Sequence, residues 1–181
     1  MKGLMILNSN CEDVEALGTR ALLRRAGSHV DTVTTTESKS IKTAFGLSLE
    51  ADFLLKDINE KDYQFLVIPG GRYVHETIDY DLKIQEIAIR FASSNRLIAA
   101  ICAGPRFLGR AGLLDAKNFT AYPGSEKDIP KGFYQPEEKA VTDGNFITAR
   151  GAGAIYEFSY HIVKKLFSEK EAKALFENIR Y

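Results

Sequence analysis

The chain has 181 residues, and its 24 lysines and arginines balance its 24 aspartates and glutamates, so the formal net charge is zero. This balance argues against a nucleic-acid-binding module, which usually carries a basic excess. Hydrophobic residues make up 45% and charged residues 27% of the chain, which excludes a disordered protein and favours a single domain over residues 1–181. The chain has only 2 cysteines and 3 histidines, which excludes a disulfide framework and leaves few candidates for imidazole chemistry.

The start of the chain does not have the pattern of a targeting segment. A short apolar-rich stretch before Asn8 is followed by polar and acidic residues, whereas a signal peptide needs a longer apolar region. No apolar run approaches the roughly 20 residues of a membrane-spanning helix. We therefore expect a cytoplasmic protein with no membrane partner and no nucleic-acid partner.

The first half of the chain alternates short apolar runs with one helical pattern. Three runs predict buried strands, at Leu4–Leu7, Val30–Thr35 and Phe65–Ile68. Apolar residues recur at helical spacing over Val14–Ala26, and Gly27 is typical of the residue that follows a helix. Residues 36–60 predict no long helix, only β-prone stretches near Ile41 and Leu47.

The second half continues the alternation of strands and helices. Helices are predicted over Leu82–Ala92, residues 103–111, Ala154–Phe167 and Glu169–Ile179. A buried strand is predicted at Leu97–Ile101 and a short one at Phe119–Tyr122, while Lys139–Thr142 and Phe146–Ala149 flank a hairpin turn at Asp143-Gly144. Uniformly apolar strands that alternate with helices predict an α/β fold, with a mostly parallel sheet covered on both faces.

The most informative segment is Ile98–Pro105, where a buried strand leads directly into Cys102 and then into small residues and a helix. This order resembles the strand–nucleophile–helix elbow of hydrolases. Cys102 would then lie at the carboxyl end of a parallel strand, where α/β sheets form ligand crevices. It would also lie at a helix N-terminus, which favours the thiolate. The alternative is a buried structural cysteine with no reactivity.

Two neighbouring features could complete a site at the same edge of the sheet. Gly70 and Gly71 follow a predicted strand, and their N–H groups, with that of Ala103, could form an oxyanion hole beside Cys102. A tight turn alone would also explain the two glycines. Glu15 begins the first helix just beyond the first strand, although a solvated acid that complements the helix dipole is the ordinary interpretation of such a residue.

Taken together, these segments resemble the ThiJ/PfpI superfamily, and within it the parkinsonism-associated protein deglycase branch. The string Ala-Ala-Ile-Cys-Ala-Gly-Pro is highly specific, whereas the other matching pieces are weak when taken alone. The matching pieces span nearly the whole chain in family order: Glu12–Glu15, Arg24–Gly27, Ile68–Gly71, Ala99–Pro105, Arg150–Ala154 and Tyr156–Phe158.

The resemblance implies a flavodoxin-like three-layer α/β sandwich that is usually a homodimer. It implies that Cys102 is a nucleophilic, oxidation-prone cysteine and that Glu15 is the carboxyl group that hydrogen-bonds its sulfur. Gly70, Gly71 and Ala103 would be the backbone donors around it. A carboxyl group that donates to a thiolate or sulfinate must be protonated, so we expect a raised pKa for Glu15.

The sequence departs from the resemblance where relatives place a histidine. Relatives of this branch often carry one near the cysteine, on the loop that here contains Tyr122, and the peptidase branch carries one where Ala103 stands. Of the histidines present, we expect His29 and His161 on the surface or a packed face, and His75 as the only one that could lie near the pocket. Tyr122 and His75 are therefore candidate pocket residues.

Three further residues are candidates for the site. Arg25 and Arg150 are candidate pocket residues that could orient a substrate carboxylate, although ion pairing on the surface or between subunits is the alternative. Cys11 could be a resolving thiol for Cys102, but we favour a position in the loop without a role. We expect no cofactor and no metal.

Three functions follow from these candidates. The first is cysteine-dependent conversion of reactive carbonyls, such as methylglyoxal to lactate without glutathione, or the related deglycation of amines. The second is a redox sensor or stress-response chaperone without catalysis, signalled by oxidation of Cys102. The third is a cysteine peptidase or amidase, which the lack of a histidine beside Cys102 disfavours.

Overall fold

A seven-stranded sheet with the strand order β10-β11-β7-β6-β1-β2-β5 forms the centre of the computed structural model, which describes residues 1–181. Its strands are β1 (Lys2–Ile6), β2 (His29–Thr34), β5 (Phe53–Leu54), β6 (Phe65–Ile68), β7 (Leu97–Ile101), β10 (Ala140–Asp143) and β11 (Phe146–Ala149). Every neighbouring pair is parallel except the predicted hairpin of β10 and β11. The mostly parallel α/β fold is therefore confirmed.

The central strands are apolar at nearly every position because both of their faces are buried. In the register of the sheet, Leu66 of β6 pairs with Leu4 of β1 on one side and with Ile98 of β7 on the other. The exception is Gly3, where an added Cβ atom would lie 2.0 Å from Cζ of Phe65. A glycine at this position lets the aromatic ring of the neighbouring strand lie across β1.

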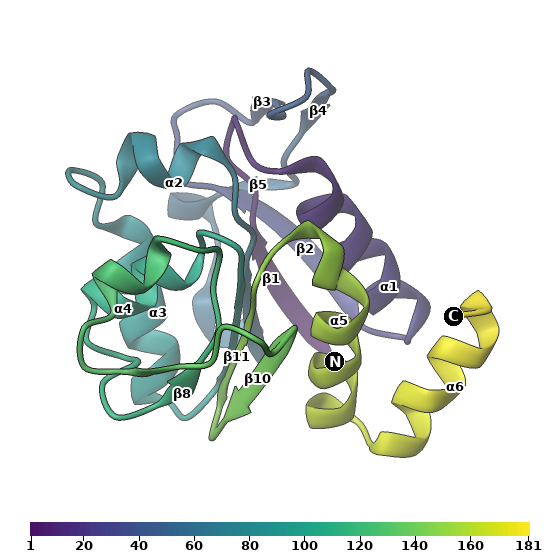
Figure 1. The fold of residues 1–181 in the computed structure, drawn as a ribbon. Helices are drawn as coiled ribbons and strands as arrows, with labels where there is room; N and C mark the ends of the chain where they lie inside the picture. The colour runs from purple at the N-terminus through teal and green to yellow at the C-terminus, as the bar shows by residue number, and fades with distance from the viewer.

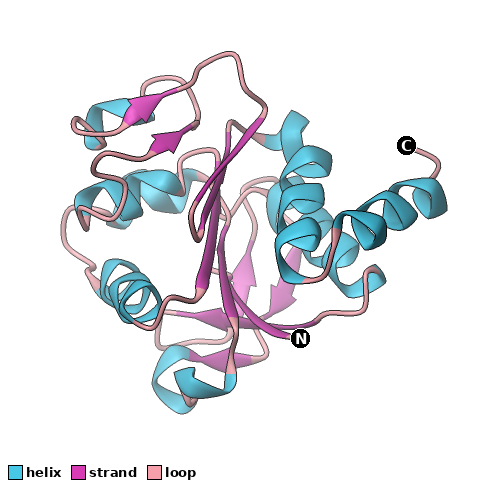
Figure 2. Ribbon diagram, turned by 90° about the horizontal axis from the view of Figure 1, so that it is seen from below, coloured by secondary structure: helices cyan, strands magenta, loops and turns pink.

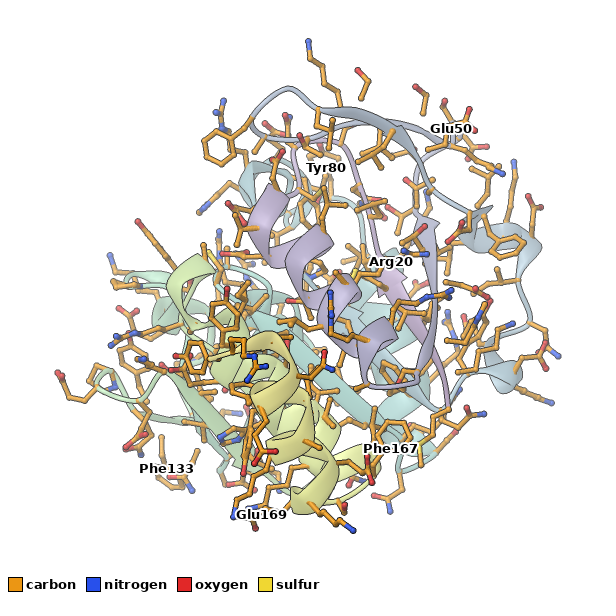
Figure 3. All side chains as sticks on the ribbon, turned by 90° about the vertical axis from the view of Figure 1, so that its right-hand side faces the viewer. Arg20, Glu50, Tyr80, Phe133, Phe167 and Glu169 are labelled. Carbon is orange, nitrogen blue, oxygen red and sulfur yellow. The ribbon has the colours of Figure 1, made fainter.

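Helices cover both faces of the sheet, as Figures 1 and 2 show. One face carries α1 (Thr19–Arg25), α5 (Ile155–Leu166) and α6 (Glu169–Ile179), and the other carries α2 (Arg72–Thr77), α3 (Lys83–Ser93) and α4 (Pro105–Arg110). Two hydrophobic clusters, of 27 and 19 buried residues, fill the two layers between helices and sheet. Figure 3 looks onto the α1, α5 and α6 face, where Arg20 and Glu169 are labelled.

The smaller elements lie outside the central sheet. The β-prone stretches near Ile41 and Leu47 form an antiparallel pair, β3 (Ser40–Lys42) and β4 (Ser48–Glu50). The strand predicted at Phe119–Tyr122 is shorter, because β8 (Asn118–Phe119) pairs only with β9 (Phe133–Tyr134). None of the helices is long and apolar enough to cross a bilayer.

The arrangement of the strands determines where a ligand crevice forms. The connection after β1 leads to β2 on one side, whereas β6, β7 and β11 follow one another on the other side of β1. In open α/β sheets the crevice lies beyond the carboxyl ends of the strands at such a reversal of order. The segments that follow β1, β6 and β7 meet there, and they contain Glu15, Gly70 and Cys102.

Candidate active site

Cys102 occupies a strained turn between β7 and α4. Its φ angle is 62°, in the left-handed region that residues other than glycine rarely adopt, at a penalty of roughly 1–3 kcal/mol. Two backbone hydrogen bonds hold it there, from Cys102 N–H to the Ala149 carbonyl (2.8 Å) and from Tyr122 N–H to the Cys102 carbonyl (2.9 Å). Gly104 lets the turn close, since a Cβ atom there would lie 2.5 Å from the Ile68 carbonyl oxygen.

Glu15 lies in a π-helical turn, Val14–Gly18, that precedes α1. The predicted helix over Val14–Ala26 is therefore divided, and turns of this kind occur frequently at functional sites. The Glu15 N–H donates to Oε2 of Glu12 (2.6 Å), and the Glu15 side chain points inward, with only 1% of the residue exposed. There its carboxyl group lies within hydrogen-bonding reach of the Cys102 side chain.

Two backbone N–H groups also face the Glu15 carboxyl group. Gly70 N–H donates to Oε2 of Glu15 (2.9 Å), and Ala152 N–H hydrogen-bonds the same carboxyl group. A Cβ atom on Gly70 would lie 2.6 Å from both Glu15 Oε2 and Cys102 Cβ. The glycine is thus required for the close approach of three chain segments rather than for a turn alone.

A different constraint explains why residue 71 is a glycine. Its φ angle is 124°, and an added Cβ atom would lie 2.3 Å from the Asn10 carbonyl oxygen, because Gly71 forms a β-bridge with Cys11. This bridge holds the end of β6 against the segment that leads into Glu15.

The Glu15 carboxyl group is buried without a cation among its partners. Burial raises its pKa to about 7, the negative charge of Glu12 acts in the same direction, and the hydrogen bonds from Cys102 and Gly70 oppose the rise. A carboxyl group with this pKa exchanges its proton near neutral pH, which is what acid–base chemistry requires.

The same surroundings raise the pKa of the Cys102 thiol, first through burial and then through the charge of an ionised Glu15, while the Ala103 N–H acts the other way. This differs from the thiolate expected at a helix N-terminus, because burial and the adjacent carboxylate outweigh the dipole of the six-residue α4. Neutral Glu15 removes this repulsion, so the protonation states of the two groups are linked.

The three N–H groups expected to surround Cys102 have different surroundings in the structure. Gly70 N–H is already directed to Glu15 and is not free for an oxyanion. Ala103 N–H faces the Cys102 sulfur, and neither Ala103 nor Gly71 donates its N–H to a backbone carbonyl. Of the three, only Ala103 has its N–H directed at the cysteine, and a donor role for Gly71 stays a prediction.

None of the three histidines pairs with Cys102. Nδ1 of His75 lies 2.6 Å from Arg106 Nη1, and His29 and His161 contact Asp31 and Thr142. The structure therefore assigns His75 to a contact between α2 and α4 rather than to the pocket.

The remaining candidate residues separate into two groups. Tyr122 and Arg150 line one depression of about 390 Å³, whose wall includes Ala152. Arg25 does not line it. Its guanidinium donates to Asn178 (3.2 Å), and it borders another depression between α1 and the end of α6.

Cys11 lies in the loop after β1, as expected, but it is fully buried there beside the site. Burial, reinforced by the charge of Asp13, raises the pKa of its thiol to about 12. Both cysteines are free thiols in this structure. The pKa of the Cys102 thiol is raised as well, so the pKa values do not distinguish the two cysteines, and the absence of a role for Cys11 stays a prediction.

Sequence reasoning did not identify the parts played by Glu12 and Ala152. Glu12 accepts from the Glu15 backbone, and Ala152 donates to the Glu15 side chain. Ala152 could have been found from the order of the strands. It follows β11, the neighbour of β7, and therefore lies at the same edge of the sheet as Cys102. No group of three or more histidine, cysteine, aspartate or glutamate side chains is arranged to hold a metal ion.

Fold and site together define a flavodoxin-like α/β protein with a cysteine on an elbow and a buried carboxyl group beside it. Residues 1–165 match the model of the DJ-1/PfpI family. The chain belongs to the DJ-1/PfpI family, so the resemblance seen in its sequence is confirmed.

Relatives in the family span distant organisms. A Pyrococcus horikoshii protein named as a deglycase is 31% identical over 167 residues, which cover 92% of this chain and 99% of the relative. DJ-1 homolog A of Arabidopsis thaliana is 32% identical over 163 residues, 89% of this chain and 42% of that longer protein. The crystal structure of Drosophila melanogaster DJ-1beta has a TM-score of 0.90 at 27% identity, covering 98% of this chain and 96% of the other.

Proposed function

We propose that this protein converts small α-oxoaldehydes such as methylglyoxal into 2-hydroxy acids, with Cys102 as nucleophile and Glu15 as general acid and base. The observation that carries the proposal is the cation-free burial of Glu15 against Cys102, which raises the carboxyl pKa to about 7. At neutral pH this carboxyl group can therefore both accept and donate a proton. The chemistry needs neither glutathione nor a cofactor.

The proposed steps balance with water as the only co-reactant. The Cys102 thiol adds to the aldehyde carbon: ionised Glu15 takes the S–H proton as the sulfur bonds to carbon and passes that proton to the aldehyde oxygen, forming a hemithioacetal. Ionised Glu15 then removes the proton from that carbon, and a proton returned to the neighbouring carbon through an enediol gives a thioester. Water hydrolyses the thioester, which releases the 2-hydroxy acid and restores the thiol.

Backbone donors support the charged intermediates of this scheme. The Ala103 N–H faces the sulfur, and the Gly71 N–H has no backbone acceptor, so both are available to an oxyanion formed at the aldehyde carbon. Tyr122 stands where relatives of this branch often carry a histidine, and a phenol is a poor base near neutrality. We therefore expect slower turnover than in relatives that carry the histidine.

The test is lactate formation from methylglyoxal, followed by proton NMR. Cys102→Ala is expected to abolish the activity, and Cys11→Ala, which removes the other thiol, is expected to retain it. Lactate formation that persists unchanged in Cys102→Ala would refute the proposal.

A redox role is the second candidate, and one observation favours it. Both the Glu15 carboxyl group and the Ala103 N–H are directed at the Cys102 sulfur, where they would stabilise a sulfinate. Mild peroxide should then add two oxygen atoms to Cys102, seen by mass spectrometry, and Glu15→Asp should change the peroxide concentration required. If the peroxide concentration required is the same in wild type and Glu15→Asp, the redox role is contradicted.

Three broader features of the proposal rest on the relatives and on composition. The relatives named as deglycases support small carbonyl or glycated substrates. A homodimer is proposed from the resemblance to the family, and a cytoplasmic location from the two free thiols. Peptide hydrolysis is disfavoured because no histidine pairs with Cys102.

A further inference from the structure

The depression lined by Tyr122 and Arg150 contains one unpaired cation. Arg150 is the only charged residue among its 10 lining residues, and it takes part in none of the ion pairs of the protein. Its guanidinium is thus free to bind an anionic ligand. The walls are otherwise apolar or hydroxyl-bearing, formed by Tyr122, Pro123, Tyr134 and Pro136 with the small residues that follow Arg150.

The place of Arg150 in the sheet relates this cation to the nucleophile. Ala149 of β11 pairs with Ile101 of β7, so Arg150 and Cys102 are the next residues on two neighbouring strands. Neighbouring strands lie about 4.8 Å apart. The guanidinium therefore extends into the depression from a backbone position close to that of Cys102.

The wall of the depression is also part of the catalytic pair's support. Ala152 lines the depression, and its N–H donates to the Glu15 carboxyl group. Tyr122 lines it as well, and its N–H donates to the Cys102 carbonyl (2.9 Å). Cys102 and Glu15 do not themselves line the depression, so a ligand that reaches both would have its two ends at adjacent parts of this edge of the sheet.

We propose that Arg150 makes the site selective for α-oxoaldehydes that carry a carboxylate at the far end of a short carbon chain. This inference rests on the proposed function and names its substrate class. A single guanidinium matches a carboxylate through two parallel hydrogen bonds, whereas a phosphate dianion would require more positive charge than the depression offers. The chain between the two ends would pack on Tyr122 and the prolines.

The corresponding reaction is an internal redox step with water. For 4,5-dioxopentanoate the aldehyde carbon is oxidised to a carboxylate and the neighbouring ketone carbon is reduced to an alcohol, which gives 2-hydroxyglutarate. The Cys102 and Glu15 steps are the same as for methylglyoxal, and only the binding of the far carboxylate is added.

The experiment compares 4,5-dioxopentanoate with 2-oxopentanal, which has the same carbon chain without the carboxylate. The measured quantity is the ratio of kcat/KM for the anionic substrate to that for the neutral one. In Arg150→Gln this ratio should fall by about tenfold to a hundredfold, and Arg150→Lys should retain part of the preference. Lys165→Gln removes the same charge from the exposed surface of α5 and should leave the ratio unchanged. A ratio that is equal in wild type and Arg150→Gln would overturn the inference.

A binding measurement separates this inference from the proposed function. 4-Oxopentanoate lacks the aldehyde and cannot react, so its Kd can be measured by NMR titration in wild type and in Arg150→Gln. If no α-oxoaldehyde turns over, the proposed function fails, while weaker binding of 4-oxopentanoate to Arg150→Gln still supports the anion site. Equal Kd values in the two proteins would overturn it whatever the turnover.

Discussion

Two buried carboxyl groups, Asp31 in β2 and Glu15 in the turn before α1, have opposite electrostatic surroundings. Asp31 of β2 is 6% exposed, and its carboxylate contacts Lys2 (3.1 Å), His29 (2.7 Å) and the Tyr63 hydroxyl (2.9 Å). Burial would raise its pKa, but the hydrogen bonds from Lys2 and Tyr63 outweigh it and hold the pKa below the usual range. Glu15 is 1% exposed, and its pKa is raised to about 7.

The difference shows how burial alone does not distinguish a structural acid from a reactive one. Asp31 has a cation and two hydrogen-bond donors that stabilise its charge, so it stays ionised and joins β1 to β2. Glu15 receives N–H donors but no cation, and its nearest charged neighbour is the acid Glu12. A carboxyl group in the second kind of surroundings can hold or release a proton during a reaction.

The largest expected effect is on activity. Glu15→Gln keeps the size of the side chain and removes the exchangeable proton, so kcat/KM for methylglyoxal should fall by about 10²–10⁴-fold. Asp31→Asn is the matched control at the other carboxyl group and should leave kcat/KM nearly unchanged. Comparable losses of kcat/KM in the two variants would contradict the assignment of different roles to Glu15 and Asp31.

The second effect is on the pH dependence of stability. Because the pKa of Glu15 is raised from 4.5 to about 7 in the folded state, its contribution to stability is fully present below pH 4.5 and is lost as the pH rises through about 7. Above that pH the buried charge destabilises the fold by up to about 3 kcal/mol, at 1.36 kcal/mol per pKa unit. Glu15→Gln should therefore be more stable than wild type at pH 8, and this gain should shrink as the pH falls and vanish below pH 4.5, in urea unfolding experiments.

The third effect tests the packing around the pair. Gly70→Ala places a Cβ atom 2.6 Å from both Glu15 Oε2 and Cys102 Cβ, so the free energy of unfolding should fall by roughly 1–3 kcal/mol. Gly153→Ala, at a site with nothing within 4 Å, is the control and should change stability little. A tolerated Gly70→Ala would mean that the three segments are less tightly packed than the structure shows.

An effect of similar size concerns Asp31 itself. Asp31→Asn weakens the contacts with Lys2 and His29, and the free energy of unfolding should fall by roughly 1–3 kcal/mol at pH 7. Since the pKa of Asp31 is lowered, its stabilisation is present above pH 3.8 and is lost as the pH falls through its folded-state pKa. The stability difference between wild type and Asp31→Asn should thus stay constant from pH 5 to 8, unlike that for Glu15→Gln.

Sequence reasoning predicted most of the fold because the central strands and long helices have strong periodic patterns. The helix Glu169–Ile179 was predicted at its observed bounds, and the strands Phe65–Ile68 and Leu97–Ile101 likewise. It extended the strand at Phe119 too far, because the turn after it depends on a hydrogen bond from Tyr122 to Cys102, a contact with another part of the chain.

The sequence led to the placement of Cys102 and Glu15 at one edge of the sheet, but not to the backbone contacts around them, and their reactivity stays a prediction. Cys102 and Glu15 follow apolar strands, and topology brings such positions to one edge of the sheet. The direction of the Gly70 N–H toward Glu15, 55 residues away in sequence, has no local signal. The same holds for the separation of Arg25 from Arg150, since both are arginines near the ends of regular elements.

The central claim is that Glu15 exchanges a proton near neutral pH, and its side-chain carboxyl carbon reports this directly. A ¹³C NMR titration of protein labelled in glutamate and aspartate carboxyl carbons, assigned with Glu15→Gln and Asp31→Asn, follows both groups in one sample. The structure predicts a Glu15 midpoint near 7 and an Asp31 midpoint below 3.8. A Glu15 midpoint at 4.5, its ordinary value, would contradict the account.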